Sequence, residues 1–328
     1  MSDTLEVLVV GAGPTGLACG IEAVRAGLKL LVVEKGCLVN SIFSYPANMT
    51  FFTTRERLEI GDLPFPSTNI KPTRGEALEY YRRAADFYKL PVHYCERVTQ
   101  IEARDGAFRV VSEAPGGRRA EYSSRTVIVA TGYYDLPNRL GIPGEDLAKV
   151  SHYALEGHAF HGRKVAVVGG ANSAAITALD LFRHGAEVTI VHREAQLSRH
   201  IKYWVRPDIE NRIKEKSIRA CFDSQITQIE ESSIRVQNAA QWFELENDFV
   251  FALTGYHPDV DLLERAGVQV DAGSFRPLSN PKTLETNVPG LYVAGVVISG
   301  RHTNEIFIEN GRFHGRQIIQ DVTERLGR

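Results

Sequence analysis

The sequence lacks the features that mark several classes of protein. Its 38 basic and 40 acidic residues give no basic excess for nucleic acid or an anionic membrane. No apolar run approaches the ~20 residues of a transmembrane helix. The N-terminus, MSDTLEVLVV, lacks the basic segment and cleavage pattern of a secretory leader. We therefore expect a cytoplasmic globular protein with no nucleic-acid or membrane partner.

Cysteine is also scarce, and its spacing excludes two kinds of site. The four cysteines are Cys19, Cys37, Cys95 and Cys221, and no CxxC occurs. A local redox dithiol and a zinc ribbon are thereby excluded, and no metal site is expected. Scattered thiols in a long chain are typical of a reducing cytoplasm.

A strand–turn–helix–strand unit opens the chain. The apolar run Leu5–Val10 predicts a strand buried on both faces. A glycine-rich turn follows, then a helix over Leu17–Ala26 that stops at Gly27, and a strand over Leu28–Val33 that ends at Glu34. The turn consists of Gly11, Ala12, Gly13, Pro14, Thr15 and Gly16.

The same order of elements returns in the middle of the chain. Strands are predicted over Val165–Val168 and Val188–Val191, and Gly185 corresponds to Gly27. The second turn consists of Gly169, Gly170, Ala171, Asn172, Ser173 and Ala174. A single glycine motif is a weak signal, but two copies in register predict two dinucleotide sites. In each, the pyrophosphate would meet the free N–H groups at a helix start.

The residue that ends the second strand of each copy distinguishes the two ligands. Glu34 can accept hydrogen bonds from ribose hydroxyls and would repel a 2′-phosphate, so the first copy is predicted to bind FAD. The second copy has His192 and Arg193 there, and arginine suits a 2′-phosphate. The second copy is therefore predicted to bind NADPH, with Lys202 as a further phosphate contact.

Two further strand ends predict how the domains are connected. One strand, Thr126–Ala130, runs into Thr131-Gly132, and another begins at Phe249 and runs into Thr254-Gly255. We expect an α/β protein with two Rossmann-like, three-layer ββα domains. The FAD domain would comprise residues 1–136 and 251–328, and the NADPH domain residues 137–250 would be inserted into it. A late strand ending at Ala294 and a helix over Phe307–Leu326 would complete the FAD domain.

These motifs together resemble a known group of flavoproteins. The glycine turn, the ATG strand end, the inserted GGxNSA unit and the late GLYVAG strand are similar to thioredoxin reductase-like proteins. Closer still, EKGCLVNSIFSYP, IKYWVRPDIE and AGVVISGRHTNEIFIENGRFHG resemble the YpdA-type bacillithiol disulfide reductases, which act in redox homeostasis. The resemblance implies a homodimer or tetramer. It also implies further FAD contacts at Lys35, Phe51, Val98, Ala130, Thr131, Gly132, Gly295, Val296, Glu305 and Ile306.

The chain departs from that group at one position of the first turn. Members commonly have cysteine where this sequence has Thr15, and a hydroxyl of such high pKa cannot perform thiol chemistry. Thr15 and His152 are nevertheless the candidate catalytic residues, His152 as a proton donor to the leaving thiolate. Because the substrate implied by the resemblance bears carboxylates, Arg301, Lys71 and Arg74 are candidate contacts for it.

Three other functions remain open at this point. IPGED followed by His152 also resembles flavin-containing monooxygenases, although their FxGxxxH fingerprint is incomplete here. A thioredoxin reductase-like ferredoxin–NADP reductase would equally lack CxxC. A flavin-binding regulator without enzymatic activity is the third alternative. The leading hypothesis is an NADPH-dependent FAD enzyme that reduces a small-molecule disulfide without a CxxC dithiol.

Overall fold

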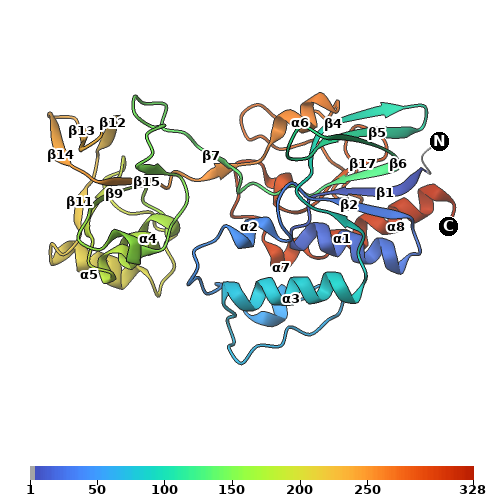
Figure 1. Cartoon of the computed structure of the whole chain (residues 1–328), viewed down its shortest axis with the longest axis horizontal. Coiled ribbons are helices and arrows are strands. Elements are labelled where there is room, and N and C mark those ends of the chain that lie inside the picture. The colour runs from blue at the N-terminus through green and yellow to red at the C-terminus, as the bar shows by residue number, and fades with distance from the viewer. Residues whose placement is uncertain (1–3) are drawn as a thin grey trace. The chain divides into compact units, whose positions relative to one another are not determined.

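The chain forms two compact units in this computed structural model, which describes residues 4–328. Unit 1 contains the segment ending at Ser44 together with Met49–Leu136 and Tyr256–Arg328. Unit 2 contains Tyr45–Asn48 and Pro137–Gly255. The chain crosses between the units at β7 (Leu136–Pro137) and β16 (Tyr256–His257), so unit 2 is an insertion into unit 1 (Figure 1).

Unit 1 is built on a seven-stranded sheet in the order β3-β2-β1-β6-β5-β4, with β17 also pairing with β6. Its strands are β1 (Leu5–Val10), β2 (Leu30–Val33), β3 (Val92–His93), β4 (Arg97–Arg104), β5 (Ala107–Glu113), β6 (Arg119–Val129) and β17 (Leu291–Val293). The long β6 runs parallel to β1 and β17 but antiparallel to β5. It therefore joins a parallel layer, which carries the first glycine turn, to an antiparallel layer.

Helices cover one face of the parallel strands, and the antiparallel layer together with α6 (Val260–Arg265) covers the other. The helices are α1 (Pro14–Arg25), α2 (Asn40–Phe43), α3 (Arg74–Phe87), α6 (Val260–Arg265), α7 (Ile308–Gly311) and α8 (His314–Leu326), with 3₁₀ turns η1 (Arg55–Leu58) and η3 (Gly295–Ser299). Helices α1 and α8 pack side by side (Figure 1). On the other face, Leu8 and Val10 pack with Ile101 of β4 and Phe108 of β5. This alternation along β1 gives three layers.

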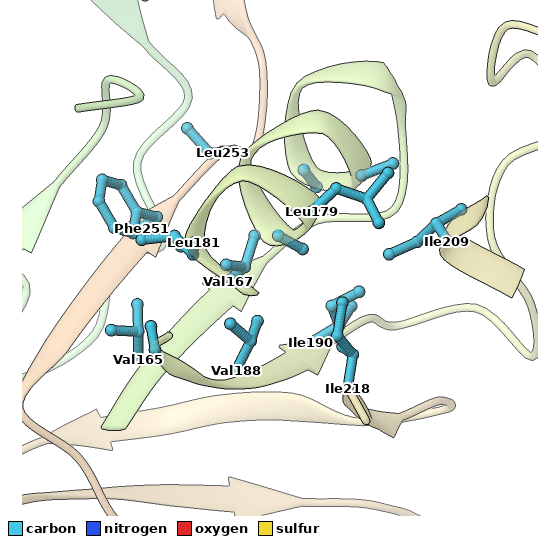
Figure 2. Close-up of a cluster of buried hydrophobic side chains, with 14 of the residues drawn as sticks. Val165, Val167, Leu179, Leu181, Val188, Ile190, Ile209, Ile218, Phe251 and Leu253 are labelled. Carbon is cyan, nitrogen blue, oxygen red and sulfur yellow. The ribbon is translucent and has the colours of Figure 1, made fainter. Parts of the chain in front are cut away.

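Unit 2 repeats the parallel part of this plan. Its sheet has the order β11-β10-β9-β15-β8, and a separate antiparallel sheet has the order β12-β13-β14. The strands are β8 (Val150–Ser151), β9 (Lys164–Val168), β10 (Glu187–Val191), β11 (Arg219–Cys221), β12 (Gln225–Ile229), β13 (Ser233–Gln237), β14 (Trp242–Glu246) and β15 (Phe249–Ala252). The helices are α4 (Asn172–Arg183), α5 (Arg206–Lys214) and the 3₁₀ turn η2 (Gly157–Phe160). Figure 2 shows aliphatic side chains of β9, β10 and α4 packed into one core.

The predicted helix over Phe307–Leu326 is wrong in one respect, because the structure divides it into α7 and α8. The break falls at Arg312 and Phe313. The Arg312 guanidinium donates to the carbonyl oxygens of Glu56 (2.9 Å) and Glu59 (2.8 Å), so this turn is fixed to η1 by contacts distant in sequence. The first helix also begins earlier than predicted, at Pro14, because proline is well suited to the first helical position.

Candidate functional site

The first glycine turn lies between β1 and α1, where its three glycines have different tasks. Gly11 has a φ of 104°, and a β-carbon on it would lie 2.6 Å from the carbonyl oxygen of Ala130. A β-carbon on Gly16 would lie 1.9 Å from the carbonyl oxygen of Gly11. At Gly13, by contrast, a β-carbon would have no atom of the described chain within 4 Å. Gly11 and Gly16 therefore permit close packing of the backbone, whereas Gly13 leaves open space beside the start of α1.

This helix start is suited to a phosphate group. Helix α1 has no side-chain cap and no acidic residue in its first turn. Its first N–H groups and its dipole therefore favour an anion. Close by, the hydroxyl oxygen of Thr131 is buried and has no hydrogen-bond partner among residues 4–328. An unpartnered buried hydroxyl and an open approach at Gly13 fit the diphosphate of a dinucleotide such as FAD.

Glu34, at the end of β2, fixes the turn to the strand beside it. Its Oε2 accepts the N–H of Ala12 (2.7 Å), and its Oε1 accepts the N–H of Gly36 (2.9 Å). Burial raises the pKa of the Glu34 carboxyl group above its usual value, and these two N–H groups oppose that effect. Because each carboxylate oxygen has two lone pairs, Glu34 can also accept from ribose hydroxyls.

Thr15 is enclosed by two glycines from the C-terminal part of unit 1. A β-carbon on Gly295 would lie 3.1 to 3.2 Å from the Oγ1, Cβ and Cγ2 atoms of Thr15. A β-carbon on Gly311, at the end of α7, would lie 2.9 Å from the Thr15 Oγ1 atom. The side chain at this position thus occupies a narrow space between η3 and α7. We refer to Thr15, Gly295 and Gly311 as the Thr15 cluster.

A histidine that the sequence analysis missed supports this cluster. The Nδ1 atom of His314, at the start of α8, accepts the N–H of Gly295 (3.0 Å). An accepting Nδ1 carries no proton, so the proton of the neutral ring is on Nε2. Burial lowers the pKa of His314, which favours this neutral form. A glycine within the predicted helix at position 311 was the available signal for a close contact here.

The other residues predicted to contact FAD all belong to unit 1. Gly132 has a φ of 74°, and the N–H of Ala130 donates to the carbonyl oxygen of Val10 (2.9 Å). Lys35 pairs with Asp135 (2.6 Å), and Glu305 accepts two hydrogen bonds from Arg276 (2.6 and 2.7 Å). Phe51 and Val98 are buried, Val296 is half-buried, and Ile306 lies near Gly311.

The second glycine turn has the corresponding geometry in unit 2. Gly169 has a φ of 135°, and a β-carbon on it would lie 2.6 Å from the carbonyl oxygen of Leu253 and 3.3 Å from the Ala174 Cβ atom. The ring of His192 lies against Gly170, where a β-carbon would come within 2.3 Å of its Nε2 atom. Burial lowers the pKa of His192. In both units, therefore, the residue that ends the second strand touches the glycine turn.

A basic loop is anchored over this second turn. Asn172, the first residue of α4, donates to the carbonyl oxygen of His200 (3.1 Å) and accepts the N–H of Lys202 (2.9 Å). The N–H of Ser198 donates to the carbonyl oxygen of Gly170 (2.8 Å). Ala171 precedes helix α4 at its N-cap position and Ser173 follows Asn172, and the helix has no side-chain cap and no acidic residue in its first turn. Arg193 is 77% exposed, and its Nε atom lies 3.6 Å from a carboxylate oxygen of Glu194.

His152 lies in unit 2, whereas Thr15 lies in unit 1. The Nε2 atom of His152 is 3.4 Å from Oε1 of Glu145, a buried carboxylate. That carboxylate also accepts the N–H groups of Leu140 (2.7 Å) and Gly141 (2.8 Å). Glu145 therefore holds both the loop before it and the imidazole of His152.

Within residues 4–328, no group of three His, Cys, Asp or Glu side chains is arranged to hold a metal ion. No helix in that range is both long enough and apolar enough to cross a membrane.

Comparisons with known proteins agree with this geometry. Residues 8–295 match the family model described as pyridine nucleotide-disulphide oxidoreductase. The chain is 41% identical over 321 residues to the bacilliredoxin reductase Bdr of Bacillus subtilis (strain 168), covering 98% of each chain. The solved bacillithiol disulfide reductase Bdr (YpdA) of Bacillus cereus is 41% identical, with a TM-score of 0.96 over 98% of this chain and 100% of the other. Its counterpart from Staphylococcus aureus is 37% identical, with a TM-score of 0.93 over 98% and 99%. The predicted fold class and family resemblance are confirmed.

Proposed function

Because the chain belongs to the pyridine nucleotide-disulphide oxidoreductase family, we propose that it is an NADPH-dependent, FAD-containing reductase of bacillithiol disulfide. The observation that carries the proposal is the similarity, over 98% of this chain, to the two solved bacillithiol disulfide reductases. The balanced reaction converts NADPH, a proton and one disulfide into NADP⁺ and two thiols. Bound FAD would carry the two electrons between the nicotinamide and the disulfide.

The chain's own residues would bind and orient these molecules. In unit 1 the turn from Gly11 to Gly16 would hold the FAD diphosphate, and Glu34 would hold the adenosine ribose. In unit 2 the turn from Gly169 to Ala174 would hold the NADPH diphosphate. The cations Arg193 and Lys202 would hold its 2′-phosphate. This assigns FAD to the discontinuous domain and NADPH to the inserted one.

Thr15 and His152 remain the proposed catalytic residues. The hydroxyl of Thr15 faces Gly311 and can donate a hydrogen bond, but it cannot form a mixed disulfide. Disulfide reduction would therefore proceed without a cysteine at this position. His152, beside the carboxylate of Glu145, would supply a proton to the leaving thiolate. A His152→Asn variant tests this, because loss of the proton donor should lower kcat with the disulfide while NADPH still bleaches the flavin.

Side-by-side assays test the proposal against its alternatives. NADPH oxidation is measured with bacillithiol disulfide, with ferredoxin and with oxygen plus an organic substrate. We expect only the disulfide to stimulate turnover. Stimulation by ferredoxin alone would instead identify a ferredoxin–NADP reductase, and substrate-dependent oxygen use a monooxygenase. A flavin that NADPH fails to bleach without oxygen would indicate a regulator.

The nucleotide assignment has its own test in Arg193→Ala. If Arg193 contacts the 2′-phosphate, the KM for NADPH rises while that for NADH stays constant. Arg163→Ala, which removes an exposed charge elsewhere in unit 2, is the control. An equal effect on both nucleotides would refute the assignment.

We also propose that the enzyme is a homodimer or tetramer in a reducing cytoplasm. The family resemblance supports the oligomer. The four cysteines, which are all free thiols in the structure, support the compartment. Light scattering of the FAD-loaded protein measures the oligomeric state, and a monomer at micromolar concentration would contradict it.

A further inference from the structure

A short hairpin loop in unit 1, residues 271–276, holds an aromatic ring in an unusual backbone conformation. We call this loop the strap. Asp271 accepts the N–H of Phe275 at its carbonyl oxygen (2.7 Å), and its N–H donates to the carbonyl oxygen of Arg276 (2.9 Å). Its Oδ1 atom accepts both the N–H (2.7 Å) and the hydroxyl (2.6 Å) of Ser274. These bonds hold Phe275 at a φ of 59°, which is costly for a bulky residue.

The strap is in close contact with the loop that follows η3. The N–H of Arg301 donates to the carbonyl oxygen of Ser274 (2.8 Å). Gly300 has a φ of 56°, and a β-carbon on it would lie 2.1 Å from that same oxygen. The backbone can approach this closely only because residue 300 is glycine. The position of Arg301 relative to Phe275 is therefore set by the backbone on both sides.

The side chains of Arg301 and Phe275 stack on each other. The Cζ atom of Arg301 is 3.9 Å from the centre of the Phe275 ring, close enough for a cation–π contact. When a guanidinium stacks on an aromatic ring, its N–H groups point outward in the plane of the guanidinium. In that plane they can donate two hydrogen bonds to one carboxylate. The strained Phe275 thus orients an arginine that extends into solvent.

Arg301 differs from Arg74, which was also predicted to contact the substrate, and from Arg276 of the strap. Within residues 4–328 its guanidinium makes no ion pair and no hydrogen bond, and it is exposed. Arg276 donates two hydrogen bonds to Glu305, and Arg74 donates to the carbonyl oxygens of Ile42 and Phe43. Of these three arginines, only Arg301 is prepared for an anion from outside the chain.

The loop that carries Arg301 begins and ends at the Thr15 cluster. It leaves the cluster at Gly295 and returns at Ile306, whose Cγ2 atom would lie 3.5 Å from a β-carbon on Gly311. Arg276 of the strap pairs with Glu305, which is proposed to contact FAD. Neighbouring strap residues, Phe275 and Arg276, therefore position Arg301 and Glu305. Building on the proposed function, we propose that Arg301 binds a carboxylate of the disulfide substrate and that Phe275 positions it.

The test compares two disulfides in the FAD-loaded enzyme. One is bacillithiol disulfide, which carries carboxylates, and the other is the uncharged bis(2-hydroxyethyl) disulfide. We expect Arg301→Ala to raise KM for the charged disulfide about tenfold or more, the effect of losing a charge-assisted hydrogen bond. The ratio of kcat/KM for the two disulfides should fall accordingly. Arg301→Lys should restore part of that ratio, and Phe275→Leu should lower it less than Arg301→Ala does.

The control variant Arg104→Ala removes a charge at the end of β4, where Arg104 pairs with Glu102, and should leave the ratio as it is in the parent enzyme. A ratio unchanged in Arg301→Ala would overturn the proposal while the proposed function stood. If the parent enzyme reduces neither disulfide, the proposed function fails instead. Binding of malate to the FAD-loaded parent enzyme, measured by calorimetry and weakened in Arg301→Ala, would support the subsite without disulfide turnover.

Discussion

The Thr15 cluster makes a quantitative prediction about Gly311→Ala. The new methyl group would lie 2.9 Å from the Thr15 Oγ1 atom and 3.5 Å from both the Gly295 Cα and Ile306 Cγ2 atoms. Overpacking of this kind costs about 1–3 kcal/mol. Replacing a helical glycine by alanine stabilises the folded state by about 1 kcal/mol. Because the overpacking is the larger effect, we expect a lower free energy of unfolding for unit 1.

A double-mutant cycle isolates this contact. Thr15→Ala removes the atoms that the new methyl group would meet, so Thr15→Ala should rescue Gly311→Ala. We expect a coupling free energy of about 1–3 kcal/mol, measured by thermal unfolding with flavin release as the probe of unit 1. Gly75→Ala, in the first turn of α3, is the control. A β-carbon there would lie 4.0 Å from its nearest neighbour, and this change should not destabilise. Coupling below about 0.5 kcal/mol would refute the packing argument.

Three further predictions concern titratable groups. Glu34→Gln replaces one of the two accepting carboxylate oxygens by an NH₂ donor. The affinity for FAD, measured by flavin fluorescence, should therefore fall about tenfold or more. An unchanged affinity would contradict the role of Glu34. Burial in the folded state lowers the pKa of His314 from its usual 6.5, so His314 binds a proton more readily in the unfolded chain than in the folded one. The melting temperature should therefore fall as the pH drops below about 6.5, and His314→Gln should weaken that dependence. Burial raises the pKa of Cys19 to about 12, so peptide mass spectrometry should find iodoacetamide on Cys37 and not on Cys19.

The sequence predicted those parts of the fold that repeat a local pattern. Both glycine turns, their flanking strands and the strand-end residues Glu34 and His192 follow from apolar runs and glycine spacing. These features depend on residues within about one βαβ unit, where periodicity and turn chemistry act directly. That is why the position of each proposed nucleotide site could be predicted without coordinates.

The parts that were missed depend on contacts between segments distant in sequence. Gly311 within the predicted helix indicated a close contact, but no local signal indicated that Thr15 is its neighbour, or that Gly295 donates to His314. The break between α7 and α8 follows from the hydrogen bonds of Arg312 to η1, which helical periodicity does not encode. Likewise, the positive φ of Phe275 is imposed by the strap and opposes the residue's own preference.

The central claim is that bound flavin reduces the disulfide without a cysteine of this chain. It is tested most directly by a variant with Cys19→Ala, Cys37→Ser, Cys95→Ser and Cys221→Ser. NADPH oxidation with bacillithiol disulfide is measured after the flavin content has been matched to that of the parent enzyme. The account predicts that kcat/KM for the disulfide is retained. Loss of disulfide-dependent turnover, while NADPH still bleaches the flavin, would contradict it.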